Sequence, residues 1–175
     1  MLKTIAILIV VLIAAMLIYA ATRPDTFHVE RSIGIKASPE KLFALINDFH
    51  QWDKWTPYNK DPAMKKTFSG AASGKGAAYA WEGNKEVGKG DISITESESP
   101  TRIAFDLHMI EPFEGRNHVV IALKPSGDAT TVTWGMDGTQ AFFVKIMGLF
   151  FSMDKMVGKD FEAGLANLKT LAEKN

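Results

Sequence analysis

Six segments between residues 64 and 140 alternate between apolar and polar side chains, and clusters of turn-forming residues separate them. The segments are MKKTFSG, GAAYAWEG, VGKGDISITESE, TRIAFDLHMI, RNHVVIALK and TTVTWGMDG. A period of two residues is typical of strands that bury one face, and strands joined by short turns form an antiparallel meander. The chain must therefore cover one apolar face of a large sheet.

A further strand and a short helix are predicted ahead of this meander. In FHVERSIGIK, residues 27–36, the apolar side chains share one face, which Arg31 interrupts. Ser38 and Pro39 then provide an N-cap hydroxyl and a proline in the first helical turn. We expect a helix to begin there and to end near Asn47.

The C-terminal segment supplies an element that can cover the sheet. Its apolar residues recur every three or four positions, and they are Met153, Val157, Phe161, Leu165, Leu168 and Leu171. This spacing predicts a long amphipathic helix. We therefore expect an α+β fold in which a curved antiparallel sheet of about seven strands wraps around this helix. Two short helices are expected after the first strand.

Residues 4–22, TIAILIVVLIAAMLIYAAT, contain no charged side chain. A helix of about 19 residues is about 28 Å long, which is close to the hydrocarbon thickness of a bilayer. We expect a transmembrane signal anchor over residues 1–22, a juncture over residues 23–26 and one domain over residues 27–175. A cleaved signal peptide is the alternative, although no Ala-x-Ala motif lies near the end of the apolar run.

Flanking charges give a prediction of topology. Lys3 favours a cytoplasmic position for its end of the anchor, and Arg23 at the other end opposes it. We expect a single-pass membrane protein whose domain lies on the extracytoplasmic side. The apolar run lacks a Gly-x-x-x-Gly motif, and the sequence leaves the oligomeric state open.

Composition excludes several classes of function. The absence of cysteine excludes a lipoprotein anchor, disulfides, thiol catalysis and cysteine-ligated metals. The 20 basic and 20 acidic residues form no basic stripe, so we expect no nucleic-acid partner. GAASGKG, residues 70–76, is one residue too short for a phosphate-binding P-loop and ends in Gly76 instead of Ser or Thr, so it predicts a hairpin turn. Gly88 and Gly90 predict a bulge.

Two histidines raise the possibility of a metal or proton-transfer site. If the hairpin between their strands centres on Phe113, His108 and His118 pair directly, with Asp106 on the same face. Two imidazoles and a carboxylate can bind zinc or transfer protons. The alternation of each strand nevertheless places both histidines opposite the apolar row, so we expect them to face solvent.

Two aromatic stretches flank the meander. Trp52 and Trp55 lie one turn apart and would share one face of a short helix. AFFVKIMGLFFSM, residues 141–153, is too apolar for an ordinary surface loop. It either docks under the sheet edge or forms a lid or portal that touches the membrane or an apolar ligand.

Three stretches together resemble the SRPBCC superfamily, the START-related and pollen-allergen-like fold, and within it the polyketide cyclase/dehydrase-type branch. They are VERSIGIKASPEKLFALINDFHQWDKW, YAWEGNKEVGKGDISITESESPTRIAFDL and FFSMDKMVGKDFEAGLANLK, which bracket residues 29–169. The resemblance implies a helix-grip fold with an internal hydrophobic cavity. It also implies that the short helix of Trp52 and Trp55 closes one end of the grip, where the two rings would either be core residues or lie at the mouth of the cavity. It implies no shared catalytic set, because the superfamily includes binders, transporters and cyclases.

The inward row of the strands gives the residues that would line such a cavity. Most of this row is ordinary core, but six of its residues are predicted to contact a ligand: Arg31, Tyr79, Trp81, Phe105, Asn117 and Trp134. A buried arginine needs a partner, either a structural carboxylate or an anionic ligand head. The row contains no nucleophile–base pair, no paired carboxylates and no metal cluster. We therefore predict no catalytic residue, metal or cofactor.

These features favour a membrane-anchored binding module for a small hydrophobic or lipid-like ligand held in an internal cavity. The alternative is a cyclase- or dehydrase-like enzyme acting on an aromatic or polyketide-type substrate, with Arg31, Asn117 and Tyr79 orienting it. A third possibility is a structural domain whose cavity has collapsed.

Overall fold

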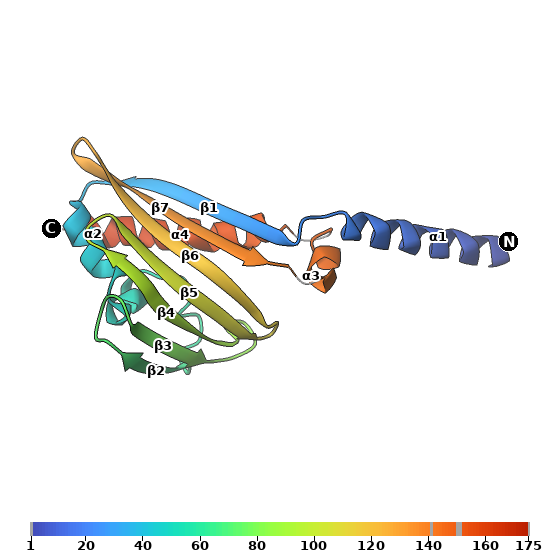
Figure 1. The fold of residues 1–175 in the computed structure, drawn as a ribbon, viewed down its shortest axis with the longest axis horizontal. Coiled ribbons are helices and arrows are strands. Elements are labelled where there is room, and N and C mark those ends of the chain that lie inside the picture. Colours follow the sequence, from blue (N-terminus) through green and yellow to red (C-terminus); the bar gives the residue numbers. More distant parts are fainter. Residues whose placement is uncertain (1, 141, 150–151, 175) are drawn as a thin grey trace.

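The computed structural model describes residues 2–140, 142–149 and 152–174. Its helices and strands, shown in Figure 1, follow in the order α1 (Leu2–Ala21), β1 (Thr26–Ile35), α2 (Pro39–Ile46), the 3-10 helix η1 (Phe49–Lys54), β2 (Lys65–Gly70), β3 (Ala77–Glu82), β4 (Lys89–Glu98), β5 (Arg102–Glu111), β6 (Gly115–Ser126), β7 (Ala129–Thr139), α3 (Phe142–Met147) and α4 (Met153–Ala172).

The strands form one antiparallel sheet in the order β1-β7-β6-β5-β4-β3-β2. The predicted meander is therefore confirmed, and β1 pairs with the last strand, β7. The register shifts between Lys89 and Gly90 and again between Ile94 and Glu96, so the bulge predicted at the glycines is present. Such bulges increase the local bend of a sheet, which helps this one to curve around a helix.

The long helix α4 packs along the sheet and contacts β1, as the amphipathic pattern predicts (Figure 1). Phe105 and Trp134 from the sheet and Phe161 from α4 are 0%, 3% and 2% exposed. They belong to one continuous core. The α+β class and the sheet-on-helix arrangement are thus confirmed.

The short helices begin where the sequence predicts. Ser38 caps α2 by accepting a hydrogen bond from the Lys41 backbone N–H, and Pro39 is its first residue. Asp48 caps η1 by accepting from the His50 backbone N–H at 2.9 Å. The two helices close one end of the grip, and Trp52 and Trp55 project from η1 and the residue after it into the core.

Helix α1 extends away from the domain (Figure 1). Among the described residues, α1 is the one helix long and apolar enough to cross a membrane. These properties suit an anchor and a signal sequence alike. Ala20 in its last turn is buried, and α1 contacts α3 near this point.

The hairpin between β5 and β6 differs from the prediction. Met109 pairs with Gly115, so the hairpin centres on Pro112 and not on Phe113. His118 consequently lies opposite Asp106, and His108 lies opposite Arg116, so the predicted histidine pair is wrong. Moving the hairpin centre by one residue shifts the cross-strand partner of each residue by two positions. Each side chain therefore stays on the same face of the sheet.

Candidate ligand-binding site

A chain of aromatic rings fills the interior of the grip between η1, β7 and α4. The ring centroids of Trp52 and Trp55 are 5.4 Å apart, and those of Trp55 and Trp134 are 5.5 Å apart. Trp134 then stacks on Phe161 of α4 at 4.3 Å with an interplanar angle of 11°. These offset and edge-on contacts are the favourable geometries for aromatic pairs.

A second group of rings joins this chain from the other half of the sheet. Tyr79 of β3 packs edge-on against Phe49 at 5.1 Å, and Phe105 of β5 packs edge-on against Trp52 at 5.3 Å. Trp81 follows Tyr79 along β3 at 5.8 Å. Burial raises the pKa of Tyr79 above its ordinary value, so its phenol stays protonated. The structure thus brings four of the six predicted residues into one connected aromatic cluster.

The four tryptophans differ in how their indole N–H groups are used. Trp52 donates to the Ile46 carbonyl at 2.8 Å, Trp55 donates to the Leu45 carbonyl at 3.2 Å, and Trp81 donates to the Val87 carbonyl at 3.1 Å. The Nε1 of Trp134 is buried and has no hydrogen-bond partner among the described residues. Buried polar groups are nearly always paired, and an unpaired one costs about 1–3 kcal/mol.

A glycine in α4 explains how Trp134 can lie so close to the helix. A Cβ added at Gly164 would lie 2.8 Å from Cζ3 of Trp134 and 3.1 Å from Cδ of Pro57. These distances are shorter than ordinary carbon–carbon contact, so any side chain at Gly164 would displace the ring. The absence of a side chain at this position therefore fixes the depth of Trp134.

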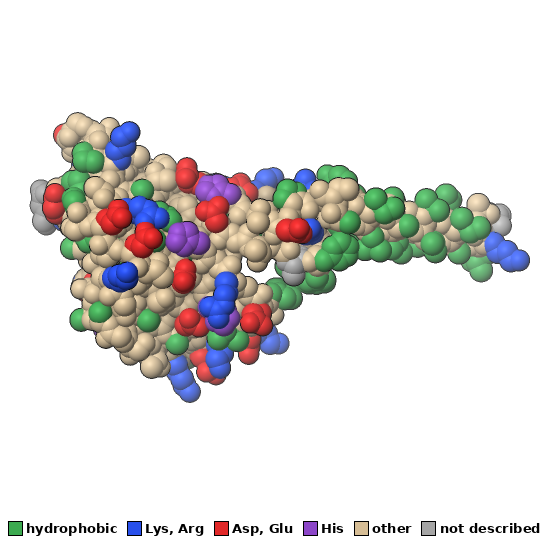
Figure 2. All heavy atoms as spheres, viewed as in Figure 1, with side chains coloured by type: hydrophobic (Ala, Val, Ile, Leu, Met, Phe, Trp, Pro, Cys, Tyr) green, Lys and Arg blue, Asp and Glu red, His purple; other side chains and the backbone are tan. Residues whose placement is uncertain are grey.

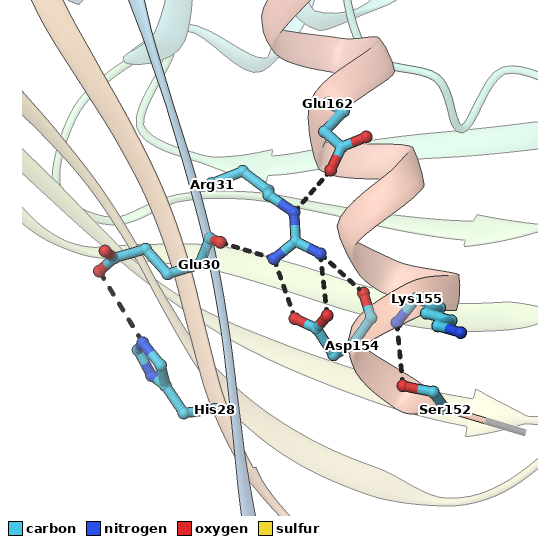
Figure 3. A network of polar contacts seen from close by, with 7 residues as sticks. All are labelled: His28, Glu30, Arg31, Ser152, Asp154, Lys155 and Glu162. Carbon is cyan, nitrogen blue, oxygen red and sulfur yellow. Dashed lines mark hydrogen bonds and ion pairs between the residues drawn. The ribbon is translucent and has the colours of Figure 1, made fainter.

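Arg31 lies opposite Trp134 in the strand pairing, and its guanidinium binds α4 (Figure 3). Its Nε donates to Glu162 at 2.7 Å, and its Nη1 and Nη2 donate to the two carboxylate oxygens of Asp154 at 2.9 and 3.0 Å. Further bonds go to the backbone carbonyls of Glu30 and Asp154 at 2.7 and 3.1 Å. Because a guanidinium has five N–H groups, these bonds engage all of them.

The electrostatics of this network follow from its hydrogen bonds. Those to Asp154 and Glu162 raise the pKa of Arg31, and the guanidinium in turn lowers the pKa of the Asp154 carboxyl. A Cβ at Gly158 would overlap Nη2 of Arg31, so this glycine makes room for the arginine. Of the two partners considered from the sequence, the carboxylates are the ones that Arg31 contacts.

Asn117, the sixth predicted residue, lies at the rim of the concave face. Leu107, Asn117, Gly138 and Phe27 lie opposite one another across β5, β6, β7 and β1, and all four are half-buried. The inward-facing residues two positions further along these strands are buried. Trp134 belongs to the inward row two positions beyond them. Burial therefore decreases along the concave face toward the end of the sheet that adjoins α3.

The outward residues next to this rim form an alternating row of carboxylates and imidazoles: Asp106, His118, Asp137 and His28. Nδ1 of His28 lies 2.7 Å from Asp137, and Nδ1 of His118 lies 3.7 Å from Asp106. This row borders a groove of about 800 Å³, and Figure 2 shows histidine and acidic side chains close together on this face. The described residues contain no group of three or more such side chains that could hold a metal ion.

Several residues that shape the site were not anticipated from the sequence. Gly158 and Gly164 make room for Arg31 and Trp134, and Asp154 and Glu162 bind Arg31. A signal for the glycines was present, because a glycine inside an amphipathic helix costs about 1 kcal/mol and needs a packing reason. The acids carried no such signal, since exposed acids are common on helices.

Comparison with known proteins agrees with this geometry. The family model described as "Polyketide cyclase / dehydrase and lipid transport" matches residues 26–173, from the first residue of β1 to the C-cap of α4. The chain belongs to this family. Its description names polyketide cyclases, dehydrases and lipid transport. A search of curated proteins found no significant match.

A separate search of solved structures found proteins that share the helix-grip fold at low sequence identity. The major latex-like protein 151 of Panax ginseng is 12% identical with a TM-score of 0.62, and the match covers 86% of this chain and 99% of that one. The Aha1 dimer of Colwellia psychrerythraea is 19% identical with a TM-score of 0.59, and the match covers 85% and 97%. A Chromobacterium violaceum protein is 15% identical with a TM-score of 0.60, covering 87% and 100%.

Proposed function

We propose that this family member is a membrane-anchored module that binds a small hydrophobic or lipid-like ligand through the concave face of its sheet. One observation carries the proposal, namely the buried and unpaired indole N–H of Trp134. In this proposal the rings that fill the grip move apart on binding, an oxygen of the ligand accepts the hydrogen bond from Trp134, and the ligand's apolar part packs against the surrounding rings. An apolar site with a few placed polar groups is the usual form of a small-molecule site.

The residues proposed to contact the ligand divide into two sets. Tyr79, Trp81, Phe105 and Trp134 belong to the connected aromatic cluster. Asn117 lies at the half-buried rim, where it pairs with Gly138, four residues after Trp134 on β7. It provides a polar contact at the entrance. Arg31 is left out of the proposed site because all of its donors already bind α4 and its own strand.

The enzymatic alternative would require Arg31, Tyr79 and Asn117 to act on one substrate. Arg31 binds the carboxylates of α4, Tyr79 packs in the aromatic cluster, and Asn117 lies at the rim. In the described part of the chain no hydrogen bond or ion pair joins any two of these three side chains, and this arrangement favours binding over catalysis.

Membrane anchoring by α1 completes the proposal. Its length and apolar composition support a span, and nearly all of its residues are exposed. The Lys3 end then lies in the cytoplasm, and the domain lies on the extracytoplasmic side. In this position the domain can exchange a hydrophobic ligand with the bilayer to which it is tethered.

Native mass spectrometry of the full chain released from detergent micelles tests the binding proposal. We expect a defined extra mass that organic extraction recovers as a hydrophobic compound containing a hydrogen-bond acceptor. The Trp134→Phe variant should retain less of this ligand. The Trp55→Phe variant should retain as much as the wild type, because the indole N–H of Trp55 already donates to the Leu45 carbonyl. A bare chain that stays bare after exposure to a lipid extract of its host would refute the proposal.

A further inference from the structure

Helix α3 has the opposite polarity from a helix that faces water. Its charged residue, Lys145, is 7% exposed, whereas Phe142, Phe143 and Met147 are 47%, 52% and 40% exposed. A surface helix in water normally turns its charges outward and its apolar residues inward. The inversion indicates that the outer side of α3 faces an apolar environment.

The apolar surface extends from α3 onto the hairpin between β5 and β6. Phe113 at this hairpin is 61% exposed, and its ring lies 5.8 Å from that of Phe143. We call the surface formed by Phe113, Phe142, Phe143 and Met147 the apolar shelf. Figure 2 shows apolar side chains below the base of α1, where α3 lies in Figure 1. Exposed apolar patches of this kind mark interaction sites.

A polar clamp fixes the shelf to the end of α1. The Nζ of Lys145 donates to the backbone carbonyl of Arg23 at 3.0 Å and forms an ion pair with Asp25. Ala20, in the last turn of α1, is fully buried. The shelf therefore holds a fixed position beside the point where α1 joins the domain.

The residues at this junction are those found where helices leave a bilayer. Arg23 lies over the ring of Tyr19 at 5.8 Å, and both side chains are exposed. Tyrosine and basic residues concentrate at the membrane–water interface, where an aromatic ring meets the headgroups. If α1 spans the bilayer, this pair marks the headgroup level, and the shelf lies beside it.

We propose that the apolar shelf inserts into the lipid bilayer surface, so that the domain lies on the membrane at a fixed orientation. This inference rests on the proposed anchoring by α1 and adds a second, independent contact. A lipid surface fits the observations because the shelf is apolar, adjoins an apolar helix of bilayer length, and is held to that helix by the Lys145 clamp. Peripheral apolar side chains of this kind bind at the boundary of headgroups and acyl chains.

The orientation has a consequence for ligand exchange. Gly138 of the half-buried rim lies four residues before Phe142, the first residue of α3, and β7 is tied to the junction through the bond from Gln140 N to the Asp25 carbonyl at 2.7 Å. The rim of the concave face therefore opens beside the shelf. A hydrophobic ligand passing between the bilayer and the rim would cross little water.

Single spin labels can measure the depth of the shelf directly, because the chain contains no cysteine. We would label Phe113→Cys and Phe143→Cys in the full chain, reconstituted in vesicles of phosphatidylcholine and phosphatidylglycerol. Ile9→Cys reports the anchor, and Asp128→Cys, in the turn between β6 and β7, reports the water-exposed far end. Met147→Cys is a second label on α3 if the change at Phe143 disturbs packing.

The shelf labels should lose their accessibility to a water-soluble nickel chelate and gain accessibility to oxygen, as the Ile9 label does, while the Asp128 label shows the reverse. If the nickel chelate reaches the labels at Phe113, Phe143 and Met147 while the label at Ile9 lies in lipid, insertion of the shelf is overturned and anchoring by α1 stands. Shielding of the shelf labels from both reagents would show that protein covers the shelf, which also overturns the inference. Nickel access at Ile9 would overturn both the anchor and the shelf.

Discussion

Arg31 and Trp134 lie directly opposite each other on β1 and β7, and both side chains reach α4 at a glycine. Arg31 contacts the helix at Gly158 and is held there by Asp154 and Glu162, whereas Trp134 contacts it at Gly164. One strand pair therefore sets both the rotation and the distance of α4 relative to the sheet. The ion pairs fix its rotation, and the stacked ring fixes its distance.

Gly164→Ala should destabilise the protein even though alanine favours helices. The new methyl group would lie 2.8 Å from the Trp134 ring, and overpacking of this kind costs about 1–3 kcal/mol against a propensity gain of about 1 kcal/mol. Chemical unfolding of the full chain in detergent measures the change. Adding Trp134→Phe should recover part of the loss, because phenylalanine lacks the clashing atoms.

The control for helix propensity is Ala163→Gly at an exposed position of α4. We expect it to cost about 1 kcal/mol, the difference between glycine and alanine in a helix. A Gly164→Ala variant that is more stable than the wild type would show that Trp134 does not pack closely on α4.

Asp154→Asn should reduce stability in a way that depends on pH. Arg31 lowers the pKa of Asp154 in the folded state, so the carboxylate stabilises the fold above its unfolded pKa of about 3.9 and stops doing so as pH falls through the lower folded value. The stability difference between wild type and variant should be full near pH 6 and shrink below about pH 4. Urea unfolding at both pH values measures it, with Asp128→Asn in an exposed turn as the control. A difference that stays constant with pH would contradict the ion pair.

Trp52→Phe should cost more stability than Trp134→Phe. Both changes remove the same atoms from the core, but only the first breaks a buried hydrogen bond, from Trp52 to the Ile46 carbonyl at 2.8 Å. Loss of that bond adds about 1–3 kcal/mol. Thermal unfolding of the ligand-free variants compares them, and equal losses would mean that the Trp134 N–H has a partner in the folded protein.

Lys145→Met should loosen the joint between α1 and the domain. The change removes the bond to the Arg23 carbonyl and the ion pair with Asp25, and leaves an apolar side chain of similar length. A spin label at Ala21→Cys should become more mobile. Lys155→Met, at an exposed position of α4, should leave the spectrum unchanged. An unaltered line shape in Lys145→Met would show that the clamp does not hold the joint.

Much of the fold follows from periodicity in the sequence. The seven strands, α2 and α4 were predicted because each carries a clear period of two or of three to four residues, and the Ser38 and Pro39 signals located the start of α2. The register of the β5–β6 hairpin was not predicted correctly, because the residues between Glu111 and Gly115 allow the hairpin to centre on either of two adjacent residues. Alternation survives a shift of one residue in the centre, so the outward face of His118 was still predicted. His108, also expected to face solvent, is instead half-buried beside Asp91.

The candidate site was predictable only in outline. Alternation gave the inward face and hence the aromatic candidates, but the partners of Arg31 and the unpaired N–H of Trp134 depend on how α4 is rotated against the sheet. That rotation is set by close contacts at Gly158 and Gly164, which single-sequence patterns do not specify. The segment of residues 141–153 was recognised as unusual, and within it Ala141, Phe150 and Phe151 lie outside the described residues. The inverted polarity of α3 became visible only once Lys145 was located.

The most direct measurement of ligand binding is the NMR spectrum of the indole N–H groups in protein labelled with nitrogen-15 at tryptophan. Four tryptophans give four signals, which single Trp→Phe variants assign. Between delipidated protein and protein carrying its extracted ligand, we predict a large downfield shift of the Trp134 signal and small changes for Trp52, Trp55 and Trp81, which already have acceptors. A Trp134 signal that does not move when the ligand is present would contradict the account.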